Sequence, residues 1–108
     1  MVLVDQSRRA LARLGIEDPG AYLRPLLEAA LEESLQRGSG ALTGPVVRGD
    51  AGTVAAHLDA LADLDATAAP LEPGDVSDTY RALAVAALAR ASLAEGGRET
   101  IRALLEAA

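Results

Sequence analysis

The chain lacks cysteine, lysine, phenylalanine and tryptophan, and each absence excludes a class of chemistry. Without cysteine there is no disulfide, thiol nucleophile or thiolate metal site. Without lysine the chain cannot form a Walker A nucleotide loop. His57 is the single histidine, and the carboxylates show no paired metal-ligand spacing, so the sequence predicts no metal site.

The charge balance is acidic, which disfavours two kinds of partner. All ten cations are arginine, and sixteen Asp and Glu give a formal net charge of −6. An acidic surface argues against nucleic acid and anionic membranes, which bind clustered cations. The sequence has no apolar run of membrane-spanning length, and the segment Met1–Asp5 lacks a basic signal-peptide start. We therefore expect a cytoplasmic protein with no membrane partner.

The residues that are abundant favour helices. The chain contains 24 alanines and 18 leucines, and its aromatic residues are Tyr22 and Tyr80. Alanine and leucine have high helix propensity, whereas the aromatic and β-branched residues that favour strands are scarce. A length of 108 residues suits a single domain over residues 1–108. The composition therefore predicts an all-α bundle.

Apolar spacing and cap residues divide the chain into about five helices. The expected helices cover residues 2–14, 19–37 and 50–63, a fourth from near 76 until Gly96 and Gly97 break it, and a short fifth. Apolar stripes on the second and fourth helices are expected to be buried. The stripe residues are Leu23, Leu26, Leu27, Ala30, Leu31 and Leu35 in the second helix, and Tyr80, Leu83, Ala84, Ala87, Leu88 and Ala91 in the fourth. Asp50 is the expected N-cap of the third helix, and Asp75 or Ser77 that of the fourth.

The segment from Thr43 to Asp50 is expected to be a loop between rigid helices, a usual place for a binding site. Arg48 can bind a carboxylate or phosphate through two hydrogen bonds, and the N-terminus of the next helix favours anions. Gly44 and Gly49 would let a ligand approach the backbone closely. His57, two turns into that helix, can exchange a proton near neutral pH. The candidate substrate-binding residues are Thr43, Gly44, Pro45, Arg48, Asp50 and His57.

The sequence pattern alone also allows purely structural roles for these residues. Arg48 could pair with Asp50 or with a nearby glutamate, and His57 could be a residue at the boundary of the core. Tyr80 begins the apolar stripe of the fourth helix, so packing is its expected role.

Four ordered blocks of sequence resemble one known family. The blocks are Leu23-x-x-Leu26-Leu27-x-x-Ala30-Leu31, Ala41-Leu42-Thr43-Gly44-Pro45-Val46-x-Arg48-Gly49-Asp50, Thr53-Val54-x-x-His57-Leu58-x-x-Leu61 and Tyr80-Arg81-x-Leu83-Ala84. They are similar to the helical C-terminal domain called domain of unknown function 2520. That domain follows a Rossmann domain in proteins related to 6-phosphogluconate dehydrogenase, pyrroline-5-carboxylate reductase and ketopantoate reductase.

The resemblance implies a 6-phosphogluconate dehydrogenase C-terminal-domain-like bundle. Its helices would supply the contacts of a homodimer and one wall of a cleft for a small keto or hydroxy acid. The segment from Thr43 to Asp50 would face that cleft. NAD or NADP would be held by an N-terminal Rossmann domain that these residues lack, so the 108-residue chain alone is expected to be inert.

Two hypotheses of different classes follow. In the first, the chain is the substrate-side and dimerisation domain of an NAD(P)-dependent oxidoreductase, cut from a longer polypeptide. The first helix begins without a capping signal, as a truncated helix would. In the second, the chain is a stand-alone helical protein-interaction module without catalysis. A bundle that only packs would have no use for the polar set of Thr43, Arg48, Asp50 and His57, which favours the first hypothesis.

Overall fold

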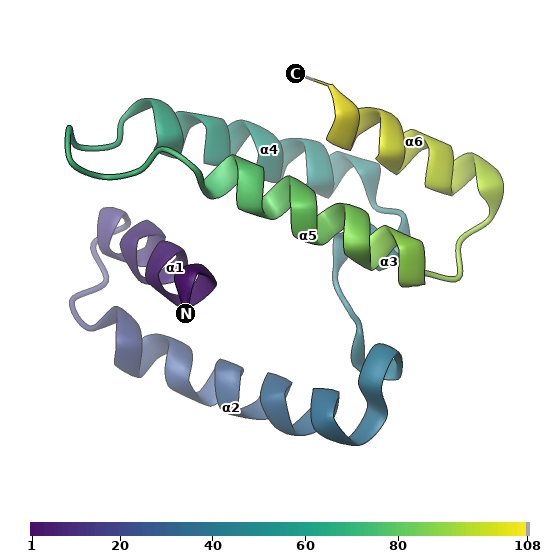
Figure 1. Cartoon of the computed structure of the whole chain (residues 1–108), viewed down its shortest axis with the longest axis horizontal. Coiled ribbons are helices and arrows are strands. Elements are labelled where there is room, and N and C mark those ends of the chain that lie inside the picture. The colour runs from purple at the N-terminus through teal and green to yellow at the C-terminus, as the bar shows by residue number, and fades with distance from the viewer. Residues whose placement is uncertain (108) are drawn as a thin grey trace. The chain divides into compact units, whose positions relative to one another are not determined.

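The computed structural model describes residues 1–107, and every regular element in that range is a helix (Figure 1). The all-α prediction is therefore confirmed, with five helices of twelve residues or more and two short turns. The elements are α1 (Val2–Arg13), α2 (Pro19–Arg37), the 3₁₀ turn η1 (Gly38–Ala41), α3 (Pro45–Arg48), α4 (Ala51–Ala66), α5 (Val76–Arg90) and α6 (Glu95–Glu106). The chain divides into two compact units, Met1–Ala41 and Leu42–Ala108.

The first unit pairs α1 with α2 and ends in η1. Helix α2 starts where the sequence predicts, because the Asp18 side chain accepts a hydrogen bond from the Ala21 N–H at 3.1 Å and Pro19 occupies the first helical position. The expected burial of its leucine stripe is wrong for most of its members. Leu23 is buried, whereas four leucines remain largely exposed. These are Leu26, Leu27, Leu31 and Leu35.

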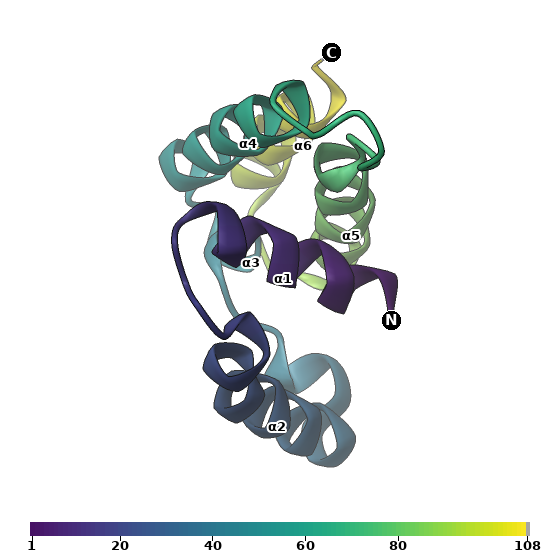
Figure 2. The same cartoon turned by 90° about the vertical axis from the view of Figure 1, so that its left-hand side faces the viewer.

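The second unit contains the main hydrophobic core, built by α4, α5 and α6 with α3 against them (Figure 2). Val54 of α4 and Ile101 of α6 are fully buried at its centre. On α5, the predicted stripe holds for Ala84 and Leu88, which are buried, but Leu83 is half exposed. Among the described residues, those buried in this core are Val46, Val54, Leu58, Ala84, Leu88, Ile101 and Leu105.

The junction between α5 and α6 differs from the prediction that Gly96 and Gly97 end the fourth helix. Helix α5 already ends at Arg90, and the two glycines lie in the first turn of α6. At this earlier end, the Arg98 guanidinium of α6 donates to the carbonyls of Leu88 and Ala91. The Leu88 carbonyl also accepts from the Ala91 N–H at 3.2 Å. A cation beside the last carbonyls of a helix stabilises the helix end.

Arg81 stabilises the end of α6 in the same way. Its Nη1 donates to the Leu105 carbonyl at 2.7 Å and to the Leu104 carbonyl at 3.3 Å. Two arginines, Arg81 and Arg98, thus tie α5 and α6 together through backbone carbonyls. The second unit owes part of its cohesion to these side chains as well as to its apolar core.

The N-terminus of α5 is capped by a residue that is distant in sequence. Neither the Asp75 nor the Ser77 side chain makes the predicted cap hydrogen bond. Instead the Asp65 carboxylate, in the last turn of α4, accepts from the N–H groups of Val76 and Ser77, each at 3.0 Å. This non-local cap fixes the connection between α4 and α5.

Replacing the carboxylate, Asp65→Ala, should lower the free energy of unfolding by about 1 kcal/mol at neutral pH, the usual cost of losing a helix cap. Urea denaturation followed by circular dichroism measures this change. Asp63→Ala, on the exposed side of the same helix turn, is the matched control and should stay within about 0.5 kcal/mol of wild type. Equal losses for the two variants would contradict a capping role.

The same contribution should depend on pH. Burial raises the pKa of Asp65, but hydrogen bonding from Ser77 and from the Val76 N–H outweighs it, so the net pKa is lowered. A carboxyl whose pKa is lower in the folded state stabilises the fold above the unfolded value of about 3.9. The difference between wild type and Asp65→Ala should therefore shrink as pH falls from about 4 through the lowered folded value.

Candidate functional site

The segment predicted to be a loop contains a helical turn. Gly44, with φ of 106°, precedes α3, and Pro45 occupies its first position. Gly49 then adopts the left-handed conformation, with φ of 71°, and ends α3 directly before Asp50. The chain therefore turns twice at glycines, and α3 sets Arg48 just ahead of the N-terminus of α4.

Asp50 is the N-cap of α4, as the sequence predicts. Its Oδ1 accepts from the Thr53 N–H at 3.1 Å, and its Oδ2 accepts from the Thr53 hydroxyl at 2.7 Å. The expectation of an open helix N-terminus ready for an anion is thus wrong in part, because this carboxylate already uses the Thr53 N–H. The two bonds from Thr53 lower the pKa of Asp50, and the charges of Arg48 and His57 lower it further.

Arg48 is exposed at the C-terminal end of α3. Its guanidinium makes no ion pair within 4.0 Å and no hydrogen bond with the part of the chain that the structure describes. The alternative in which Arg48 is an ion-pair partner of Asp50 is therefore wrong at contact distance. Arg48 acts on Asp50 through its charge alone and keeps its hydrogen-bonding capacity.

The two glycines of this segment differ in their surroundings. A Cβ on Gly49 would lie 3.3 Å from Leu93 Cδ2, so this glycine allows close packing against the protein itself. A Cβ on Gly44 would meet no atom within 4 Å, and Thr43 beside it is exposed. Space for a ligand to approach the backbone therefore exists at Gly44, and Gly49 serves packing instead.

His57 lies on α4 and has a polar partner on α5. Its Nδ1 is 3.0 Å from the Tyr80 hydroxyl, and the two rings meet edge to face, with centroids 5.7 Å apart and an interplanar angle of 87°. The imidazole is exposed, whereas Tyr80 is partly buried against the core. Burial raises the pKa of the Tyr80 phenol, so the phenol stays neutral at physiological pH.

Tyr80 is the polar group that sequence reasoning assigned to packing alone. The packing is confirmed, since the ring lies against the hydrophobic core, but its hydroxyl also contacts His57. The sequence contains little sign of the contact between Tyr80 and His57. Tyr80 and His57 are 23 residues apart, and their contact depends on how α4 and α5 pack.

The second unit therefore gathers a fixed cation, a carboxylate and an imidazole around the start of α4. Asp50 and His57 lie two helical turns apart on the same side of α4, and Arg48 precedes both. Such a set can bind a small acid through Arg48 and donate or accept a hydrogen bond through His57.

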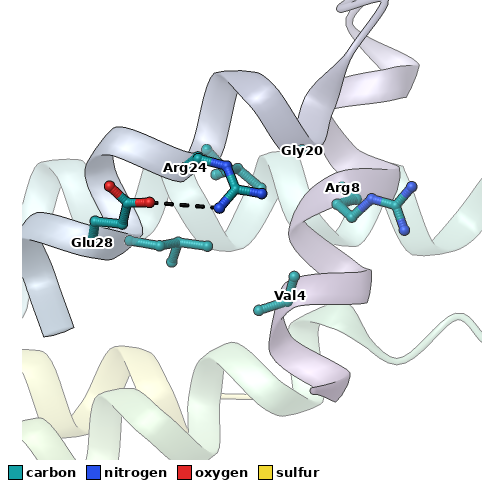
Figure 3. A pocket seen from close by; sticks show the side chains of 7 residues that line it. Val4, Arg8, Gly20, Arg24 and Glu28 are labelled. Carbon is teal, nitrogen blue, oxygen red and sulfur yellow. Dashed lines mark ion pairs between the residues drawn. The ribbon is translucent and has the colours of Figure 1, made fainter.

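A separate pocket lies within the first unit, between α1 and α2 (Figure 3). It has a volume of about 250 Å³ and includes none of the predicted site residues. Arg24 forms a 3.5 Å ion pair with Glu28, and Figure 3 shows the Arg8 guanidinium pointing away from α2. The lining residues are Val4, Arg8, Gly20, Leu23, Arg24, Leu27 and Glu28.

Residues 1–107 offer neither a metal site nor a membrane-spanning helix. No group of three or more His, Asp or Glu side chains in this range is placed to hold a metal ion. None of the helices in this range is long and apolar enough to cross a membrane.

Comparison with known families identifies the chain. The profile of the family described as Domain of unknown function (DUF2520) matches residues 1–87. The chain belongs to this family. The match covers both turns around the candidate site, together with His57 and Tyr80, and stops within α5. Comparisons with curated proteins and with solved structures gave no match.

Proposed function

We propose that this DUF2520 domain is the substrate-side and dimerisation domain of an NAD(P)-dependent oxidoreductase that acts on a small keto or hydroxy acid. The observation that carries the proposal is Arg48, an exposed guanidinium without an ion-pair partner among the described residues. Arg48 and His57, the single histidine of the chain, both act by their charge on Asp50, the N-cap of α4. A carboxylate is the ligand that best matches the guanidinium fork.

The nicotinamide cofactor would be held outside these residues. The described residues contain no β-strand, so they offer no βαβ unit for a dinucleotide. The resemblance to oxidoreductases with an N-terminal Rossmann domain supplies this part of the proposal. In this proposal the chain binds and orients the acid, and we expect the isolated chain to have no activity.

The dimerisation role is supported by the surface of α2. Leu27, Leu31 and Leu35 follow one another at intervals of four residues, so they form one stripe along the helix, and each is exposed. Exposed apolar stripes of this kind mark interaction surfaces. We assign the stripe to a second copy of the chain, in keeping with the helix contacts of related reductases.

Removing the cation tests the substrate-binding role. In the protein joined to its Rossmann domain, Arg48→Ala should raise KM for the acid by roughly 10- to 100-fold, the usual effect of losing a charge-assisted hydrogen bond. KM for NAD(P)H should not change, because the cofactor is bound elsewhere. The assay is the oxidation of NAD(P)H with a panel of small 2-keto acids.

Arg24→Ala is the matched control for this experiment. Arg24 is an exposed arginine of the first unit, paired with Glu28, and its loss should leave both KM values unchanged. If Arg48→Ala behaves like Arg24→Ala, the acid is not bound by Arg48 and the proposed role of this surface fails.

A further inference from the structure

We propose that Tyr80 is a positioning residue that fixes the tautomer of His57, so that the imidazole presents its Nε2–H to a ligand. The direct observation is the 3.0 Å contact between the Tyr80 hydroxyl and Nδ1 of His57. The tautomer assignment stands on this contact. The identity of the ligand, an acid with a keto or hydroxy oxygen, rests on the proposed function.

The direction of the hydrogen bond follows from counting donors and acceptors. A neutral imidazole has one N–H donor and one bare nitrogen that accepts, and a phenol has one O–H donor. The Tyr80 hydroxyl makes no other hydrogen bond with the described residues. If Nδ1 carried the proton, the partly buried phenol proton would have no acceptor in that part of the protein. Donation from Tyr80 to a bare Nδ1 satisfies both groups.

The protonation state of the Tyr80 phenol agrees with donation from Tyr80 to His57. Because burial raises the pKa of Tyr80, the hydroxyl keeps its proton across the neutral range and remains a donor. The edge-to-face contact, with an interplanar angle of 87°, further restricts the orientation of the imidazole. The hydrogen bond and the ring contact, both made with Tyr80, therefore hold the imidazole in one position.

The consequence for a ligand lies at Nε2, the other ring nitrogen of His57. When Nδ1 accepts from Tyr80, the single proton of the neutral imidazole is on Nε2, the nitrogen that Tyr80 does not engage. The His57 side chain is exposed, so this N–H is available to an incoming group. A neutral imidazole held this way donates a hydrogen bond to a carbonyl or hydroxyl oxygen, while Arg48 binds the carboxylate of the same molecule.

Nitrogen-15 NMR of the complete 108-residue chain tests the tautomer directly. The chain has one histidine, so its two ring nitrogens give one unambiguous pair of signals. At about pH 9, where an ordinary imidazole is neutral, their shifts report which nitrogen bears the proton. We expect the Nε2–H form to dominate in the wild type, and its ratio to the Nδ1–H form to fall roughly fivefold in Tyr80→Phe, the effect of one hydrogen bond.

The phenylalanine variant keeps the ring that packs against the core, so the fold should be preserved and circular dichroism will verify it. Tyr22→Phe is the matched control, because Tyr22 is exposed on α2 in the first unit, and its loss should leave the ratio unchanged. A dominant Nδ1–H form in the wild type, or equal ratios in wild type and Tyr80→Phe, would overturn the proposal.

Titration with pyruvate separates this proposal from the proposed function. If pyruvate binds, it should perturb the Nε2 signal of His57 in the wild type, and Tyr80→Phe and Arg48→Ala should each weaken binding several-fold. If pyruvate and other 2-keto acids have no effect while the tautomer ratio changes in Tyr80→Phe, the tautomer assignment is supported and the proposed substrate class is wrong.

Discussion

Ile101→Ala should remove a large share of the stability of the second unit. Ile101 is fully buried at the centre of the core formed by α4, α5 and α6. Truncating such a side chain costs about 2–5 kcal/mol, because the lost burial is compounded by a cavity that neighbours fill only in part. A unit of this size has a stability near the lower end of the common range of about 5–15 kcal/mol. One substitution therefore removes a large share of the total.

The measurement is urea denaturation with NMR signals resolved for each unit. His57 and Tyr80 report on the second unit, and Tyr22 reports on the first. Leu71→Ala is the control, since Leu71 is 98% exposed in the connection between α4 and α5 and its truncation should change little. A loss below about 1 kcal/mol for Ile101→Ala would mean that α6 is not an integral part of this core.

This prediction matters because α6 lies beyond residue 87, where the family match ends. The structure nevertheless shows α6 supplying Ile101 and Leu105 to the core and accepting the Arg81 hydrogen bonds at its last turn. Arg81 itself lies inside the matched region. Arg81 and the buried apolar face of α5 therefore need a helix such as α6 to pack against them.

The sequence predicts helices well where the determining contacts are local. Asp18, followed by Pro19, and Asp50 each start a helix through a cap bond that spans three residues, and both caps are confirmed. The apolar spacing of α5 likewise identified Ala84 and Leu88 as buried. The caps act within one helical turn and the stripe follows the helical period, and a pattern of residues can encode both.

The features that were missed depend on contacts between distant residues. The cap of α5 comes from Asp65, eleven residues before Val76, while the nearer candidates Asp75 and Ser77 look equally suitable in sequence. The end of α5 lies where Arg98 from the next helix binds the Leu88 and Ala91 carbonyls, although Gly96 and Gly97 are the stronger local breakers. Tertiary contacts override the local signals at both ends of this helix.

In the candidate site, too, local features could be predicted from the sequence and contacts between distant residues could not. The segment around Arg48 could be singled out by composition, because glycine, proline and a cation are grouped between apolar helices. The pairing of His57 with Tyr80 could not, because it depends on the packing of α4 against α5. The role of Gly49 was also misassigned, since its space is filled by Leu93 rather than left for a ligand.

The exposed stripe of α2 leads to the second large effect, on oligomeric state. The periodicity of these leucines predicts burial, yet Leu31 and Leu35 are 61% and 74% exposed. The same spacing that should bury a helix face within one chain can bury it against a second copy. We therefore expect the wild-type chain to be a dimer at micromolar concentration, with these leucines at the centre of the contact.

Leu31→Glu should weaken that dimer by roughly 30-fold or more, because a charge would replace an apolar anchor in the buried centre of the interface. Sedimentation equilibrium over a concentration series measures the change. The helix should remain folded, since Leu31 is exposed in the single chain and glutamate is a good helix former. Leu71→Glu, which adds the same charge at an exposed leucine away from α2, should leave the dissociation constant unchanged. A wild-type chain that keeps a monomer mass at every concentration would show that the stripe does not bind a second copy, and equal effects of the two glutamates would assign the change to net charge instead of the stripe.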